Sequence, residues 1–230
     1  MRTLILSTLM LFGCIQSQTN HALVTKQRAD ARITLGLGYL EQGNYVKARQ
    51  NLNKAIEYQP KYYRAQLAFA RYLAKVGEDV NANQLYQQAV REHPNNGDVL
   101  NNYGTYLCEQ GHYQQAEERF LQAIRSPDYY NIGDSYENAA FCALQAQQIH
   151  KARLYLQQAL LHQPDKPRAL LYLAEIEIAN FAFVEAQRRL NQYQKWYGAN
   201  ELWLQATHKL NQQRALYAQG QTEIDLRILH

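Results

Sequence analysis

Proline, glycine and cysteine are scarce in this chain. Its 230 residues include 5 prolines, 11 glycines and 3 cysteines, whereas glutamine, alanine, leucine and tyrosine are abundant. Alanine, leucine and glutamine favour helices, and few residues are present that would interrupt them. The composition therefore predicts an all-α protein and argues against a sheet-rich fold.

Neither sign of charge dominates the chain. The formal net charge is +4, and the Lys, Arg, Asp and Glu residues are interspersed. A phosphate backbone would need a stripe of basic residues, which the sequence lacks, so no nucleic-acid partner is expected. A hydrophobic content of 47% with a mean hydropathy of -0.54 indicates a core built from helical stripes instead of long apolar runs.

Motifs that carry chemistry are also missing. The sequence contains no Gly-rich phosphate loop, nucleophile elbow, CxxC or HExxH. Its seven histidines, such as His93 and His112, fall mainly near expected helix ends, and Glu117 and Glu118 are sequential on an expected helix, so they do not face each other across a cleft. The chain is therefore predicted not to be an enzyme and to use no metal, cofactor or small-molecule substrate.

One short apolar run stands at the N-terminus, in MRTLILSTLMLFGC. It is far too short to span a bilayer of roughly 30 Å as a helix, so it is interpreted as a targeting segment. Its end, LFGC, resembles the signal box of bacterial lipoproteins. That resemblance implies removal of residues 1–13, lipidation of Cys14 and, because Ile15 follows, sorting to the outer membrane. The alternative is an ordinary secretory signal in which Cys14 has no role.

Residues 14–28 follow this signal and precede the first repeat. From residue 16 to residue 28 they are polar and show no sustained periodicity, so the whole segment is expected to form a lipidated tether. As a flexible coil, the tether would hold the folded part on the order of 20 Å from the membrane surface.

A repeating pattern begins at residue 29. A small residue is followed four positions later by a large apolar one, and successive copies are 34, 34, 36 and 34 residues apart. The small residues are Ala48, Ala82, Ala116, Ala152 and Ala186, and the large ones are Leu52, Tyr86, Phe120, Leu156 and Leu190. This pattern resembles the tetratricopeptide repeat, a pair of helices. The resemblance implies a right-handed α-solenoid of five to six such repeats over residues 29–230.

The repeats are expected at 29–62, 63–96, 97–130, 133–166 and 167–200, with a degenerate sixth at 201–230. The interval of 36 places two extra residues around 126–133, which predicts a longer connection there. Repeat five has Phe181 in place of the turn glycine. Divergence toward the end of the chain is typical of the capping units of a solenoid.

Two cysteines remain once Cys14 is assigned to lipid. Cys108 and Cys142 lie on the first helices of adjacent repeats at similar heights, so a disulfide between them is expected in a compartment that permits one. The alternative is two buried free thiols that fill small gaps.

The first helix of each repeat is expected to line a concave groove that binds a peptide or an amphipathic segment. By analogy with the repeat family, the residues facing this groove are Ile33, Leu37 and Leu40 in repeat one, Leu67, Arg71 and Lys75 in repeat two, Asn101, Thr105 and Cys108 in repeat three, and Glu137, Phe141 and Leu144 in repeat four. The alternative is that these side chains only fill the inner curve or contact solvent.

The signal, the tether, the repeats and the segments NNYGTYLCEQGHY and YENAAFCAL together resemble the PilF/PilW family of type IV pilus biogenesis lipoproteins, the pilotins. The resemblance implies a lipid-anchored protein on the periplasmic face of a Gram-negative outer membrane. It also implies that the chain binds the secretin subunit of the pilus machine and promotes its localisation and multimerisation. The competing hypothesis is a lipoprotein adaptor that docks an envelope peptidase or cell-wall enzyme.

Overall fold

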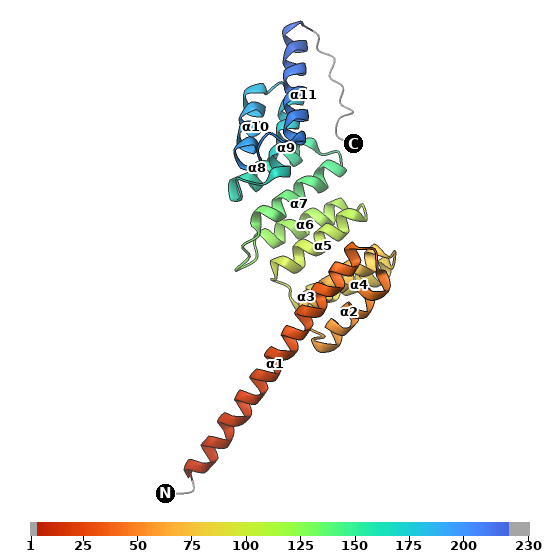
Figure 1. Ribbon diagram of the computed structural model, residues 1–230, viewed down its shortest axis with the longest axis vertical. Helices are drawn as coiled ribbons and strands as arrows, with labels where there is room; N and C mark the ends of the chain where they lie inside the picture. The colour runs from red at the N-terminus through yellow and green to blue at the C-terminus, as the bar shows by residue number, and fades with distance from the viewer. Residues whose placement is uncertain (1–3, 221–230) are drawn as a thin grey trace. The chain divides into compact units, whose positions relative to one another are not determined.

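The computed structural model describes residues 4–220, with side chains from residue 23 onward. Every regular element in this range is an α-helix, so the fold is all-α (Figure 1). Parts of the predicted signal segment and of the sixth repeat, residues 1–3 and 221–230, lie outside the described residues, as does the side chain of Cys14.

The chain forms two compact units, Met1–Pro94 and Asn95–His230. The helices of the first unit are α1 (Leu4–Glu41), α2 (Tyr45–Tyr58), α3 (Tyr63–Lys75) and α4 (Asp79–Glu92). Those of the second are α5 (Gly97–Glu109), α6 (Tyr113–Ile124), α7 (Ile132–Gln145), α8 (Ile149–His162), α9 (Pro167–Ala179), α10 (Phe183–Tyr197) and α11 (Glu201–Ala218). Helices α3, α5, α7 and α9 begin at or within one residue of the expected repeat starts.

Each helix pair packs through the small and large residues of the repeat pattern. In the third repeat, Ala116, Phe120 and Ala123 are the buried residues of α6. A Cβ atom added to Gly104 of α5 would lie 2.8 Å from the Phe120 ring, so only glycine allows the two helices to approach this closely. Gly36 stands in the same relation to Leu52 in the first repeat. The residues of the repeat pattern are thus the ones through which the two helices of a repeat contact each other.

The turn between the two helices of a repeat has one conformation throughout. Its central residue is left-handed, with φ between 58° and 81°, whether it is Gly43, Gly77, Gly111, Gln147 or Phe181. The next residue donates its backbone N–H to the carbonyl five residues earlier, at 2.8 Å in every case. This hydrogen bond closes the first helix, so the repeat keeps its turn even where glycine has been lost.

Gln147→Gly is expected to stabilise the protein by about 0.5–1 kcal/mol. A non-glycine residue pays roughly 1–2 kcal/mol in the left-handed region, part of which is offset because glycine is freer in the unfolded chain. Gln147 is exposed, so its side chain contributes little packing that would be lost. Chemical denaturation measures the change, and the reverse substitution Gly111→Gln should destabilise by a similar amount. Equal stabilities for all three proteins would contradict this account.

The connection between α6 and α7 is longer than its counterparts. It spans 125–131, compared with 59–62 and 163–166 at the ends of other repeats. Tyr129 in this connection is buried against Gly97, where an added Cβ would lie 2.3 Å from the tyrosine ring. Its neighbour Tyr130 is 86% exposed. The longer connection therefore contributes one buried ring and leaves one ring in solvent.

Residues 16–28, which were expected to be a coil, belong to α1 in the structure. The segment contains no proline or glycine, so nothing in it stops a helix from extending toward the N-terminus from the packed part of repeat one. The prediction of a flexible coil is wrong for these residues, because a segment of low amphipathicity can still continue a helix that is packed further along.

Candidate partner-binding groove and side pocket

The predicted groove residues of the first unit differ in their exposure. Ile33, Leu40 and Leu67 are buried, because α1 packs against both α2 and α3. These three side chains therefore stabilise the unit more than they offer surface to a partner. Leu37 is half-buried, and Arg71 and Lys75 are exposed. The open part of the groove face in this unit combines one apolar side chain with two cations.

An ion pair lies at one end of this face. Arg64 Nη1 is 3.3 Å from Asp30 Oδ1, and the Tyr62 hydroxyl donates a hydrogen bond of 2.7 Å to the same carboxylate oxygen. Burial and the hydrogen bond to Asp30 raise the pKa of Tyr62. The cluster ties the first helix of repeat one to that of repeat two.

In the second unit a hydrogen-bond network holds the predicted groove residue Asn101. Its Oδ1 accepts from Ser135 Oγ at 3.0 Å and from Asn138 Nδ2 at 3.2 Å. The Tyr129 hydroxyl lies 2.8 Å from Ser135 Oγ, and burial raises the pKa of Tyr129 to about 12. Thr105, also predicted, donates a hydrogen bond of 3.1 Å to the carbonyl of residue 101 on its own helix. Asn101 is thereby fixed in one orientation between α5 and α7.

The predicted residues Glu137 and Phe141 lie on α7, and each contacts residues at the start of α9 or within it. Lys166 Nζ pairs with Glu137 at 3.3 Å and also with Asp134. The guanidinium carbon of Arg168 lies 3.9 Å from the centre of the Phe141 ring, and the Tyr172 ring meets the same ring edge-on at 4.9 Å. This cluster combines an exposed cation with two aromatic rings.

Arg168 and Tyr172 were missed by the sequence reasoning, which took groove residues only from the first four repeats. The sequence does contain a signal for Arg168, because the second position of each of the first five repeats is charged. These residues are Asp30, Arg64, Asp98, Asp134 and Arg168. The structure pairs Asp30 with Arg64 and Asp134 with Lys166, and it places Arg168 against the ring of Phe141.

Cys108 on α5 and Cys142 on α7 form a disulfide. Their Cα atoms are 5.7 Å apart, within the usual range for such a bond. Both residues are buried. The bridge joins the first helices of repeats three and four near their C-terminal ends, at the end of α7 opposite to the long connection.

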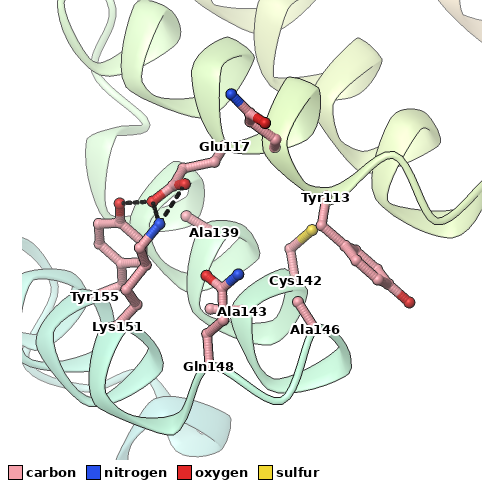
Figure 2. Close-up of a pocket in the computed structure, with 10 residues that line it drawn as sticks. Tyr113, Glu117, Ala139, Cys142, Ala143, Ala146, Gln148, Lys151 and Tyr155 are labelled. Atoms are coloured by element: carbon pink, nitrogen blue, oxygen red, sulfur yellow. Dashed lines mark hydrogen bonds and ion pairs between the residues drawn. The ribbon is translucent and has the colours of Figure 1, made fainter.

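A cavity of about 260 Å³ lies between α6, α7 and α8, separate from the predicted groove. Figure 2 shows Glu117, Lys151 and Tyr155 along one side of it and Tyr113 and Cys142 on the other. The remaining labelled lining residues are Ala139, Ala143, Ala146 and Gln148. Three alanines, which carry only a methyl group, therefore line the cavity along α7.

The polar side of this cavity is organised around Glu117. Lys151 Nζ donates to Oε1 at 3.0 Å and to Oε2 at 2.7 Å, and the Tyr155 hydroxyl donates to Oε1 at 2.5 Å. Burial opposes ionisation of Glu117, but the hydrogen bonds from Lys151 and Tyr155 outweigh it and lower its pKa. Burial and the hydrogen bond to Glu117 raise the pKa of Tyr155. The carboxylate is therefore ionised at neutral pH and held in place.

Glu117→Gln is expected to destabilise the protein by about 1 kcal/mol at neutral pH. The folded-state pKa of Glu117 lies below its ordinary value of 4.5, so this stabilisation is present above about pH 4.5 and is lost as the pH falls through the lower folded-state value. Thermal unfolding at several pH values measures the difference between the two proteins, which should shrink in acid. Glu118→Gln, an exposed neighbour, is the control and should have little effect at any pH. A difference that stays constant into acid would contradict this assignment.

No group of three or more His, Cys, Asp or Glu side chains in residues 23–220 is arranged to hold a metal ion. Within the part of the chain that the structure describes, no helix combines the length and the apolar character needed to cross a membrane.

Two family models identify the repeat, and one relative matches most of the chain. One model described as a tetratricopeptide repeat matches residues 33–97 and 143–191, and another with the same description matches 85–118. An uncharacterized protein of Haemophilus influenzae is 38% identical over 159 residues, covering 69% of this chain and 88% of the relative.

Two comparisons connect the chain to pilus assembly. The type IV pilus assembly protein PilF of Pseudomonas aeruginosa is 31% identical over 194 residues, covering 83% of this chain and 77% of the relative. A solved structure from the functional characterization of Pseudomonas aeruginosa PilF superimposes with a TM-score of 0.70 and 29% identity, covering 85% of this chain and 89% of that one.

Proposed function

Because this chain belongs to the PilF-like family of tetratricopeptide-repeat type IV pilus biogenesis proteins, we propose that it is an outer-membrane lipoprotein that binds the pilus secretin. In this role it promotes the localisation and multimerisation of the secretin. The relation to PilF over 83% of the chain carries the proposal. The LFGC segment ending at Cys14 supports lipid anchoring on the periplasmic face.

The groove face provides the contacts for such a partner. In the first unit, the half-buried Leu37 lies on α1, and the exposed cations Arg71 and Lys75 lie on α3. In the second unit, Phe141 and the stacked Arg168 combine apolar and cationic surface in the same way. A secretin segment with apolar side chains and nearby carboxylates would complement the surface of either unit, in the way that a groove lined by helices binds a peptide.

Affinity capture from membranes tests the groove. Arg71→Glu is expected to reduce recovery of the secretin at least about tenfold, since reversing a cation that meets a carboxylate costs more than about 1.4 kcal/mol. Arg91→Glu is the matched control, because Arg91 is also an exposed arginine and lies on the second helix of the same repeat. Leu37→Glu should act as Arg71→Glu does. Full secretin recovery with both groove variants, each shown to be folded by circular dichroism, would exclude this surface.

A second experiment concerns the anchor. Cys14→Ala is expected to remove both this protein and the secretin multimer from the outer membrane. Secretin rings of normal number and location in that variant would contradict the proposal. Recovery of an envelope peptidase or cell-wall hydrolase without secretin would favour the adaptor hypothesis instead.

A further inference from the structure

The cavity between α6, α7 and α8 exists because α7 has unusually small residues at two positions of the repeat. At the position of Ala139, the first helices of the other repeats carry Leu35, Phe69, Tyr103 and Leu173. At the position of Ala143 they carry Tyr39, Leu73, Leu107 and Glu177. Repeat four alone among the five has alanine at both positions. The two small residues that border the hollow are thus specific to repeat four among the five.

The next junction shows how this space is filled elsewhere. Glu177, the counterpart of Ala143, is buried, and its Oε1 lies 3.5 Å from Nε of Arg189. Arg189 is the counterpart of Tyr155. In the fourth repeat Ala143 cannot reach Tyr155 in this way, and the tyrosine bonds to Glu117 instead. In repeat five the Glu177 side chain fills this space. In repeat four the space beside Ala143 stays open, so a side chain from another molecule can enter it.

The size of the cavity limits what enters it. Pockets that enclose cofactors or drug-sized ligands measure about 300–1,000 Å³, whereas this one measures about 260 Å³. It therefore suits a single large side chain. Three alanine methyl groups and the Cys142 side chain offer apolar contact for such a group, and the disulfide of Cys142 to Cys108 holds this wall in place before binding.

The polar side of the cavity specifies a hydrogen-bond donor. A carboxylate has about four acceptor sites, and Lys151 and Tyr155 occupy three of those on Glu117. The remaining site belongs to Oε2, which accepts only from Lys151. An apolar guest would strip water from this oxygen without replacing its hydrogen bond, at a cost of about 1–3 kcal/mol. A guest with a hydroxyl on an aromatic ring can pack its ring on the alanine methyl groups and donate a hydrogen bond from its hydroxyl to the Glu117 carboxylate.

We infer that this pocket receives a tyrosine side chain from a partner protein, at a surface separate from the groove. Ala143 and the groove residue Phe141 are two positions apart on α7, about 200° around the helix, so the two surfaces lie on different sides of it. Tyrosine is among the residues that dominate protein interfaces when it fills a desolvated pocket. The inference does not depend on the secretin proposal, because no groove residue lines the pocket.

The test uses the full chain labelled with ¹³C at its alanine methyl groups and titrated with N-acetyl-tyrosinamide. The methyl resonances of Ala139, Ala143 and Ala146 are expected to shift saturably, while those of Ala48 and Ala82 stay unchanged. N-acetyl-phenylalaninamide, which lacks only the hydroxyl, should bind about 10-fold or more weakly, because a hydrogen bond to a charged group is worth about 1.5–3 kcal/mol. Equal affinity for the two probes, or no shift of the three methyl groups, would overturn the inference.

Two variants sharpen the result. Ala143→Leu fills the pocket with a residue that two other repeats already carry at this position, so it should fold and abolish the tyrosinamide shifts. Glu117→Gln leaves the volume unchanged and should remove the preference for the hydroxyl; retention of that preference would count against the inference.

The exposed Tyr130 is the obvious competing guest from a second copy. Methyl shifts that depend on protein concentration without any probe, and that disappear in Tyr130→Ala, would show that the guest is this chain itself and overturn the assignment to another protein.

Discussion

Phe120→Ala is expected to destabilise the protein by about 3–5 kcal/mol. Phe120 is 1% exposed and fills the space above Gly104, so its removal loses the transfer free energy of the ring and leaves a cavity. The backbone around it cannot easily collapse, because α5 and α6 already approach as closely as glycine permits. A loss of this size is a large fraction of the stability of a typical domain.

Chemical denaturation monitored by circular dichroism measures this loss. Leu161→Ala is the matched control, because Leu161 is a large apolar residue on a second helix but is 73% exposed. That substitution should change the free energy of unfolding by no more than about 0.5 kcal/mol. If both variants lost the same amount, the repeat pattern would not identify the core of the second unit.

Removal of the disulfide is expected to cost about 2–4 kcal/mol. Cys108 and Cys142 are separated by 34 residues, and a bridge that closes a loop of this length stabilises chiefly by restricting the unfolded chain. Both cysteines are replaced by alanine and not by serine, because serine would bury a hydroxyl group at each of these two buried sites. The loss should appear as a lower denaturation midpoint for the second unit.

The same comparison under a reductant provides the control for this prediction. Dithiothreitol should lower the stability of the wild-type protein to that of the double variant and leave the double variant unchanged. Mass spectrometry after alkylation without reduction reports the bond directly. If both thiols are alkylated in the native protein, they are free cysteines that fill gaps, and the expected loss would then reflect packing alone.

Much of the helical organisation could be predicted because the repeat is a local pattern. Helices α3, α5, α7 and α9 begin within one residue of their expected starts, and the longer connection after α6 falls where the interval changes from 34 to 36. Phe181 was recognised in place of the turn glycine, and the structure shows that it keeps the left-handed backbone of its glycine counterparts.

The exposure of the groove residues could not be predicted in the same way. Ile33 and Leu67 occupy the offsets expected for a groove, yet they are buried where first helices of successive repeats meet. Arg71, at a similar offset, is exposed. Helical spacing says which residues share a face, but the distance between two helices decides how much of that face is covered.

The sequence by itself determined the all-α class, the length of the repeat and the residues that join the two helices of each repeat, because all of these depend on contacts close in the chain. Only the tertiary structure decided what happens between repeats. The alanines of α7 are visible in the sequence, but they form a pocket because Glu117, Lys151 and Tyr155 stand opposite them on neighbouring helices. These three residues are brought together from up to 38 positions apart, and packing between helices, not local periodicity, sets such distances.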